Sequence, residues 1–147
     1  MNDILEHLEA NYPSLAAQLL TPFLDFMTKS REVSSDTDTI LMMLVIAVRS
    51  YEEPSVRGSR LPQLLARDEA WPTLGTNIRS IAASLDIPRE TVRRKVRDLI
   101  ERGWVESRNG RLHVTPQAAH ALTPLRGEFL RLALRWREVL ATLDADR

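Results

Sequence analysis

Apolar residues recur at steps of three and four along most of the chain, which is the spacing of one helical face. In the first third they run as far as Phe26, with interruptions at Pro13 and Pro22. Because Thr21-Pro22 has the form of an N-cap followed by proline in the first turn, we expect two or three short helices there. The almost wholly apolar segment 37–50 predicts a buried helix.

The pattern weakens at residues 53–75 and then sharpens. Proline and glycine punctuate this stretch, and only "LPQLLARD" could form one or two helical turns. It is long for a loop in a compact domain, so it is either functional or mobile. Apolar spacing then predicts a helix over 77–85, a break at "DI", and a second helix over 88–102 that stops at Gly103.

A hairpin and further helices are predicted for the last third. In "WVESRNGRLHVT", Asn-Gly is the centre of a tight turn. Leu112 and Val114 alternate as packed residues, so we expect His113 on the outer face. A short extended piece near Asn77 could add a third strand. Thr-Pro pairs at 115–116 and 123–124 then predict helix starts.

The order helix, tight turn, helix and hairpin predicts a mainly α protein with a small β-hairpin wing. We expect a winged helix-turn-helix with extra N-terminal helices and a long C-terminal helix. The expected segments are an N-terminal helical extension (1–34), a winged-helix DNA-binding domain (35–115) and a C-terminal helix for dimerisation (116–147).

The C-terminal helix admits two interpretations. Its apolar residues follow steps of four and three, namely Leu125, Phe129, Leu132, Trp136, Val139 and Leu143. They could pack against Leu15, Leu19 and Phe23 of the same chain, or against the same helix of a second copy. We favour a homodimer, because two-fold proteins read palindromic half-sites.

Charge is distributed unevenly, although the formal net charge is zero. Residues 1–40 hold seven acidic and two basic side chains, whereas residues 77–126 hold ten basic and five acidic ones. Such a division indicates that one face meets a polyanion and the other does not.

The predicted helix 88–102 concentrates this charge, with five basic side chains in the nine positions 89–97. At about 100° per residue, Val92, Val96, Leu99 and Ile100 form one packing stripe, and Arg93, Arg94 and Arg97 lie away from it. Arg89, Glu90 and Arg94 are placed to read bases, since arginine suits guanine and a carboxylate can accept from cytosine. Alternatively, Glu90 balances Arg93 or Arg94 within the helix.

These residues resemble the DNA-binding half of the catabolite activator and fumarate-nitrate regulator family of bacterial transcription factors. The matching elements are "IRSIAASLDI", "RETVRR", Leu99, Gly103, Val105, Gly110 and Val114. The resemblance implies base contacts from Arg89, Glu90 and Arg94 and a phosphate contact from Thr91. The GntR and MarR regulator families share much of this pattern. The chain departs from the family at Asp86, where the turn usually has glycine, and it has no counterpart of a cyclic-nucleotide β-roll.

The hairpin offers a second set of candidates. Arg108, Asn109 and Arg111 surround Gly110. We expect a wing at 106–112 on the DNA backbone or in the minor groove, which arginine commonly probes. The alternative is a solvated hairpin tip.

Composition argues against other functions. There are no cysteines, the three histidines fall in different elements, and the glycines form no phosphate loop. We therefore expect no enzyme, no metal and no cofactor. The longest apolar run, 40–48, is about half a membrane span, and "MNDILEHLEA" does not resemble a secretory signal. We expect a cytoplasmic protein without a membrane partner, and the sequence does not indicate a small-molecule effector.

Two other functions remain open at this point. One is a winged helix used as a protein-interaction module. The other is a non-specific nucleoid or plasmid DNA-binding protein, which would show salt-dependent affinity but little sequence preference.

Overall fold

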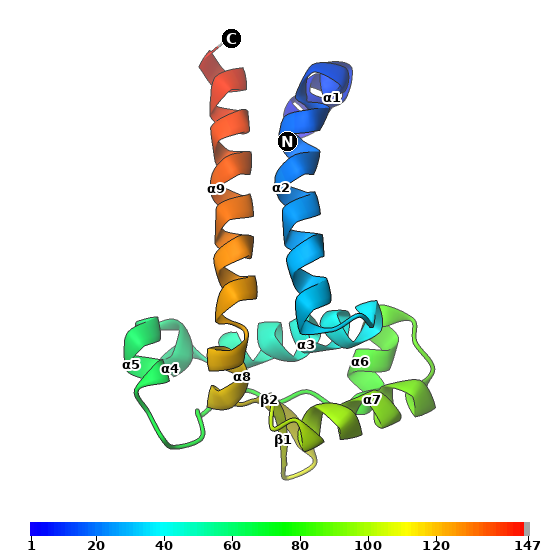
Figure 1. The fold of residues 1–147 in the computed structure, drawn as a ribbon, viewed down its shortest axis with the longest axis vertical. Coiled ribbons are helices and arrows are strands. Elements are labelled where there is room, and N and C mark those ends of the chain that lie inside the picture. The colour runs from blue at the N-terminus through cyan, green and yellow to red at the C-terminus, as the bar shows by residue number, and fades with distance from the viewer. Residues whose placement is uncertain (146–147) are drawn as a thin grey trace. The chain divides into compact units, whose positions relative to one another are not determined.

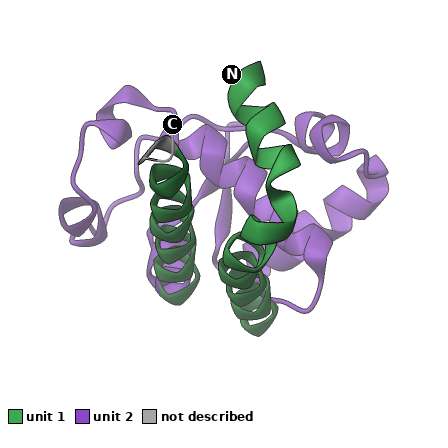
Figure 2. Ribbon diagram, turned by 90° about the horizontal axis from the view of Figure 1, so that it is seen from above, with its two compact units in different colours: residues 1–33, 124–147 green, residues 34–123 purple. Residues whose placement is uncertain are grey.

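The computed structural model describes residues 1–145 and divides into two compact units, which Figure 2 distinguishes by colour. Unit 1 combines residues 1–33 with the chain from Pro124 onward, and unit 2 spans 34–123. The protein is mainly helical, with one two-stranded antiparallel sheet and a long C-terminal helix (Figure 1). None of the helices in the described part of the chain is long and apolar enough to cross a membrane.

Unit 1 consists of α1 (Asn2–Ala10), α2 (Tyr12–Val33) and α9 (Thr123–Ala145). α2 and α9 lie side by side (Figure 1). The rings of Phe26 and Phe129 stand 5.8 Å apart, and the indole N–H of Trp136 donates to the Leu19 carbonyl over 3.0 Å. These two pairs run in opposite directions, so the helices are antiparallel. The structure shows the first of the two interpretations of the last helix, in which it packs on the N-terminal residues of its own chain, although Phe23 is 44% exposed.

The expected helix break at Pro22 is wrong. α2 continues through Pro22, and the Thr21 hydroxyl donates to the Ala17 carbonyl instead of capping a new helix. Proline removes one backbone hydrogen bond, to Gln18, whose exposed position lets water replace it. Contacts with α9 hold the rest of the helix. Pro13 does mark a boundary, since α2 begins at Tyr12 and proline fits the first turn.

Unit 2 contains eight elements. They are α3 (Thr37–Tyr51), α4 (Pro54–Arg57), α5 (Leu61–Leu65), α6 (Ile78–Leu85), α7 (Arg89–Glu101), β1 (Val105–Arg108), β2 (Arg111–Val114) and α8 (Pro116–Ala121). Asp36 caps α3, and Asn77 caps α6 by accepting from the Ser80 N–H over 2.9 Å. The main core joins α3, α6, α7, both strands and α8, with Met42, Ile46, Ile81 and Val92 completely buried.

The turns of unit 2 follow the local signals in the sequence. Asp86 adopts a left-handed conformation (φ 52°) between α6 and α7, and Gly103 does so (φ 74°) after α7. The Trp104 N–H donates to the Leu99 carbonyl and the Gly103 N–H to that of Ile100, the paired bonds of a Schellman helix end. The strand register runs from Val105 opposite Val114 to Arg108 opposite Arg111. A single bridge from Thr76 to Leu112 supplies the expected third extended piece.

A second small core organises the irregular segment 53–75. Trp71 is fully buried against Val56, Leu64 and Ala119, and its indole N–H donates to the Leu64 carbonyl over 3.1 Å. α5 falls within the predicted "LPQLLARD", whereas α4 was not predicted. The segment 53–75 therefore forms two short helices around a small hydrophobic core, where the sequence predicted a mostly irregular loop.

α8 belongs to unit 2, so the compact unit ends later than the expected boundary at Thr115. The reason is packing, because Ala118 is buried in the main core and Ala119 in the second one. A new helix does begin at Thr123, as the Thr-Pro signal predicts. Residues 146 and 147 of the expected C-terminal segment lie outside the described residues.

Candidate nucleic-acid interface

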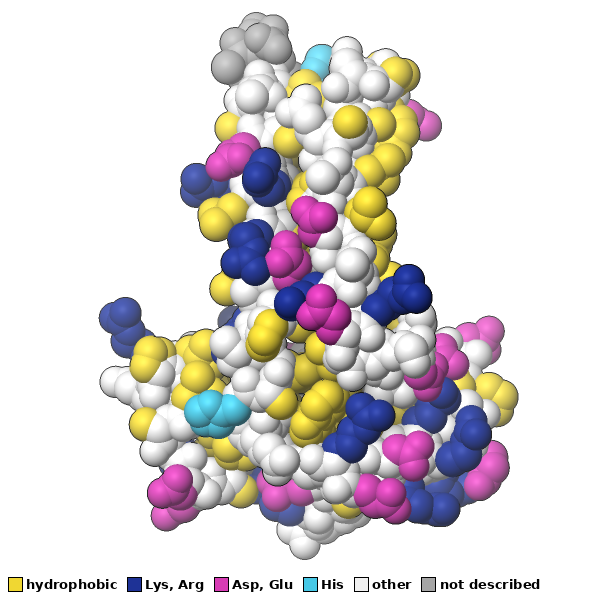
Figure 3. Space-filling model, viewed as in Figure 1, with side chains coloured by type: hydrophobic (Ala, Val, Ile, Leu, Met, Phe, Trp, Pro, Cys, Tyr) yellow, Lys and Arg dark blue, Asp and Glu magenta, His cyan; other side chains and the backbone are white. Residues whose placement is uncertain are grey.

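α7 has one packed face and one charged face. Val92, Val96 and Leu99 are at most 4% exposed, which confirms most of the predicted stripe. Ile100 is 41% exposed, so its place in that stripe is wrong; it lies too far round the helix to reach the core. Four arginines project into solvent: Arg89, Arg93, Arg94 and Arg97. Figure 3 shows basic side chains gathered at the α6–α7 end of unit 2, with acidic ones among them.

Glu90 forms an ion pair with Arg93, one turn along α7. This is the pairing that the sequence left open as the alternative to base reading. Both side chains are largely exposed, at 79% and 51%. Exposed pairs of this kind contribute about 0–1 kcal/mol, so a ligand could exchange either partner at little cost. Thr91 is half-buried beside them.

Lys95 has a different role from the arginines. Its side chain is only 13% exposed and is paired with Asp36, the N-cap of α3. Asp36 also accepts from the Thr39 hydroxyl (2.7 Å) and from the Asp38 N–H (3.2 Å). The hydrogen bond from Lys95, followed by that from Thr39, lowers the pKa of Asp36 below 3.8. Lys95 thus ties the cationic helix to the start of α3.

The hairpin turn has the predicted geometry. Asn109 (φ 51°) and Gly110 (φ 73°) both have positive φ, as a type I′ turn requires. Asn109 and Arg111 are exposed. Arg111 makes one long hydrogen bond, 3.4 Å, from its guanidinium to the Gly75 carbonyl. These two residues remain available at the surface.

Arg108 is half-buried and is engaged within the chain. Its guanidinium donates to the Trp71 carbonyl over 3.0 Å and to the Thr73 hydroxyl over 3.3 Å. Its Nε lies 3.2 Å from a carboxylate oxygen of Glu106. Of the three hairpin candidates, Arg108 is therefore the one already committed to contacts inside unit 2.

The expectation that His113 lies on the outer face is wrong. Its side chain is buried, and its Nδ1 lies 2.8 Å from the Thr73 hydroxyl. The segment 71–76 covers this face of β2, which makes the strand buried on both sides. Burial lowers the pKa of His113 below 6.5, and the charge of Arg108 lowers it further.

Gly75 allows the covering segment to approach so closely. A Cβ there would lie 2.5 Å from the Cβ of Arg111 and 2.8 Å from the His113 ring nitrogen. Neither this backing of the hairpin nor the Lys95–Asp36 link was predicted from the sequence. The single hint was a tryptophan within an otherwise polar, proline-rich stretch.

The structure gathers the predicted candidates on two elements of unit 2. Arg89, Glu90, Thr91, Arg93, Arg94 and Arg97 lie on α7, and Arg108, Asn109 and Arg111 lie on the hairpin. Figure 1 shows α7 and the hairpin along the same edge of this unit, away from α3. Among residues 1–145, no cluster of three His, Cys, Asp or Glu side chains could hold a metal ion.

Comparison of the chain with protein-family models, with curated proteins and with solved structures gave no match. The geometry of α7 and the hairpin is therefore the basis for the functional interpretation.

Proposed function

We propose that this protein is a sequence-specific, double-stranded DNA-binding transcriptional regulator of the cytoplasm, built on a winged helix. One observation carries the proposal. α7 buries its apolar stripe in the core, Arg94 and Arg97 are exposed on the other side, and Arg89 is exposed at the first turn. A helix of this width fits the major groove, where arginine recognises guanine through two hydrogen bonds.

The hairpin serves as the wing in this proposal. Arg111 and Asn109, at the exposed tip, lie along the backbone or in the minor groove. Arg108 holds the base of the wing through Trp71 and Thr73. Glu90 either accepts from a cytosine after releasing Arg93 or stays paired and leaves base reading to Arg89 and Arg94.

A homodimer fits the surface of unit 1. Leu20, Phe23, Leu24 and Met27 on α2 are 36–64% exposed, and Leu130 and Leu134 on α9 are more than half exposed. Apolar side chains in such numbers on paired helices mark a protein interface more often than bare surface. We therefore assign α2 a share of the dimer contact, beyond the C-terminal helix alone.

The test is selection of DNA duplexes from a random pool by the purified full-length protein. Enriched palindromes are the expected result. Binding that depends on salt but enriches no sequence would instead indicate a nucleoid or plasmid protein. No binding to any duplex at low salt would reject the proposal and favour a protein-interaction module.

A further inference from the structure

A groove runs along one side of the α2–α9 pair, within unit 1. Its volume is about 420 Å³, and its walls come from both helices. Ala17, Pro22 and the buried Val139 supply apolar surface. The size lies within the range of about 300–1,000 Å³ that is typical of small-molecule sites.

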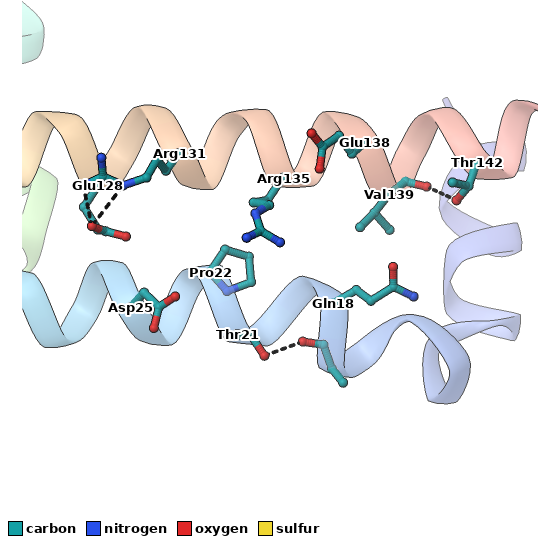
Figure 4. Close-up of a pocket in the computed structure, with 11 residues that line it drawn as sticks. Gln18, Thr21, Pro22, Asp25, Glu128, Arg131, Arg135, Glu138, Val139 and Thr142 are labelled. Carbon is teal, nitrogen blue, oxygen red and sulfur yellow. Dashed lines mark hydrogen bonds and ion pairs between the residues drawn. The ribbon is translucent and has the colours of Figure 1, made fainter.

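The charges in this groove are only partly neutralised by one another. Arg131 donates to Glu128 over 2.8 Å, and this bond lowers the pKa of Glu128. In contrast, Arg135, Asp25 and Glu138 form no ion pair within the described residues. Figure 4 shows Arg135 pointing from α9 toward Pro22 on α2, with Asp25 on one side and Glu138 on the other.

This arrangement discriminates between kinds of ligand. A simple anion at Arg135 would face two unpaired carboxylates, and a simple cation at Asp25 or Glu138 would face the free guanidinium. A molecule that carries both charges can pair its anionic group with Arg135 and its cationic group with one of the two carboxylates. The apolar surface beside them suits a short aliphatic chain.

We propose that the groove binds a free α-amino acid with an aliphatic side chain. Arg135 forks onto the carboxylate, and Asp25 or Glu138 accepts from the ammonium group. Pro22 and Val139 contact the side chain, and Gln18 also lines the groove. The role of this ligand as an effector of DNA binding rests on the proposed function; the binding itself does not.

Isothermal titration calorimetry of the full-length protein without DNA tests the binding. The probes are L-leucine, L-valine and L-methionine, with N-acetyl-L-leucine and L-leucinamide as forms that each lack one charge. We expect at least one amino acid to bind and both capped forms to bind about tenfold more weakly or worse. The proposal is overturned if no amino acid binds up to about 10 mM, or if the capped forms bind equally well.

Variants locate the site. Arg135→Gln should weaken the binding about tenfold, because it removes the carboxylate partner. Arg137→Gln is the matched control, since Arg137 is exposed on α9 but lies outside the groove. Circular dichroism confirms that both variants remain helical. Equal affinity of the two variants would place the ligand elsewhere and overturn the assignment.

A last measurement separates this inference from the proposed function. The amino acid that binds is added to the protein on its selected DNA, and a change in DNA affinity identifies it as an effector. Failure of the protein to bind any DNA, with or without the amino acid, would reject the regulator while leaving the calorimetric result intact. If no amino acid gave a binding heat, the proposed amino-acid site in the groove would be rejected while the proposed DNA binding would stand.

Discussion

Among single residues, Arg94 separates base reading from phosphate contact most clearly. It is exposed on α7 and, within the described residues, is free of the ion pair that engages its neighbour Arg93. If it bonds a guanine, Arg94→Ala should cost about 1–3 kcal/mol of binding free energy on the selected site and relax preference at one base pair. Fluorescence anisotropy with the selected duplex and its single-base variants measures both effects.

The control for Arg94 is Arg137→Ala, which removes an exposed arginine from unit 1 and should leave DNA affinity unchanged. An equal loss on selected and random duplexes would show that Arg94 contacts only phosphate, contrary to the base-reading role.

His113 should make folding stability depend on pH. Burial keeps its pKa below 6.5 in the folded state, so the unfolded chain takes up a proton first as the pH falls. The His113 contribution to stability is therefore complete above pH 6.5 and is lost as the pH falls from there through the lowered pKa. Urea unfolding at about pH 7.5 and about pH 5.5 measures the loss.

His113→Gln keeps a polar side chain at this position but removes the titrating group. The variant should lose less unfolding free energy than the wild type over the same pH interval. The same loss in both proteins would assign the pH dependence to groups other than His113.

Among the elements, the turns and helix ends were predicted best from the sequence, because neighbouring residues determine them. The α6–α7 turn, the end of α7 and the hairpin were all foreseen from Asp86, Gly103 and Asn109-Gly110. Each of these signals acts within one turn of chain, through a positive φ or a cap. The charged face of α7 was foreseen for the same reason, because helical periodicity alone places it.

The features that the sequence did not predict depend on contacts with residues far away along the chain. Pro22 reads locally as a break, yet contacts with α9, a hundred residues on, keep α2 continuous. His113 was expected on the outer face because the alternation of apolar residues in β2 identifies only the face that packs on the main core. Residues 71–76 cover the other face of the strand. The sequence suggests that Arg108 is a free residue of the hairpin, but its guanidinium donates to the Trp71 carbonyl. Tertiary packing outweighs local preference at each of these positions.

The hairpin arginines should divide between a structural and a binding role. Arg108→Met removes the bonds to Trp71 and Thr73 but keeps the aliphatic stem, so it should lower the free energy of unfolding by about 1–2 kcal/mol. It should also speed amide exchange at Leu112, whose N–H donates to the Thr76 carbonyl over 2.8 Å. Hydrogen exchange without DNA measures this directly.

Arg111→Met is the matched control, because Arg111 is the cross-strand partner of Arg108 and is exposed. It should change stability by less than about 0.5 kcal/mol but reduce the salt slope of DNA binding by about 0.9. Equal destabilisation by both variants would contradict the anchoring role of Arg108, and an unchanged slope would remove Arg111 from the interface.

For the whole molecule, the two units carry different surfaces. Unit 2 concentrates exposed arginine on α7 and the hairpin, whereas unit 1 exposes apolar side chains along α2 and α9. This division matches a protein in which one unit meets DNA and the other meets a second copy. It also accounts for a net charge of zero in a proposed DNA-binding protein, since the acidic N-terminal third balances the basic segment.

The homodimer is tested by the double substitution Leu20→Glu and Leu24→Glu on α2. These side chains are 51% and 64% exposed, so glutamate should leave the contacts between α2 and α9 intact. Buried in a dimer, four added carboxylates would be strongly unfavourable. We expect sedimentation to show a monomer with unchanged helicity, and affinity for a palindromic site to fall to that of one half-site. Ile100→Glu, on unit 2 and 41% exposed, should remain dimeric. Persistent dimers in the double variant would move the interface off α2, and a monomeric wild type would reject the homodimer.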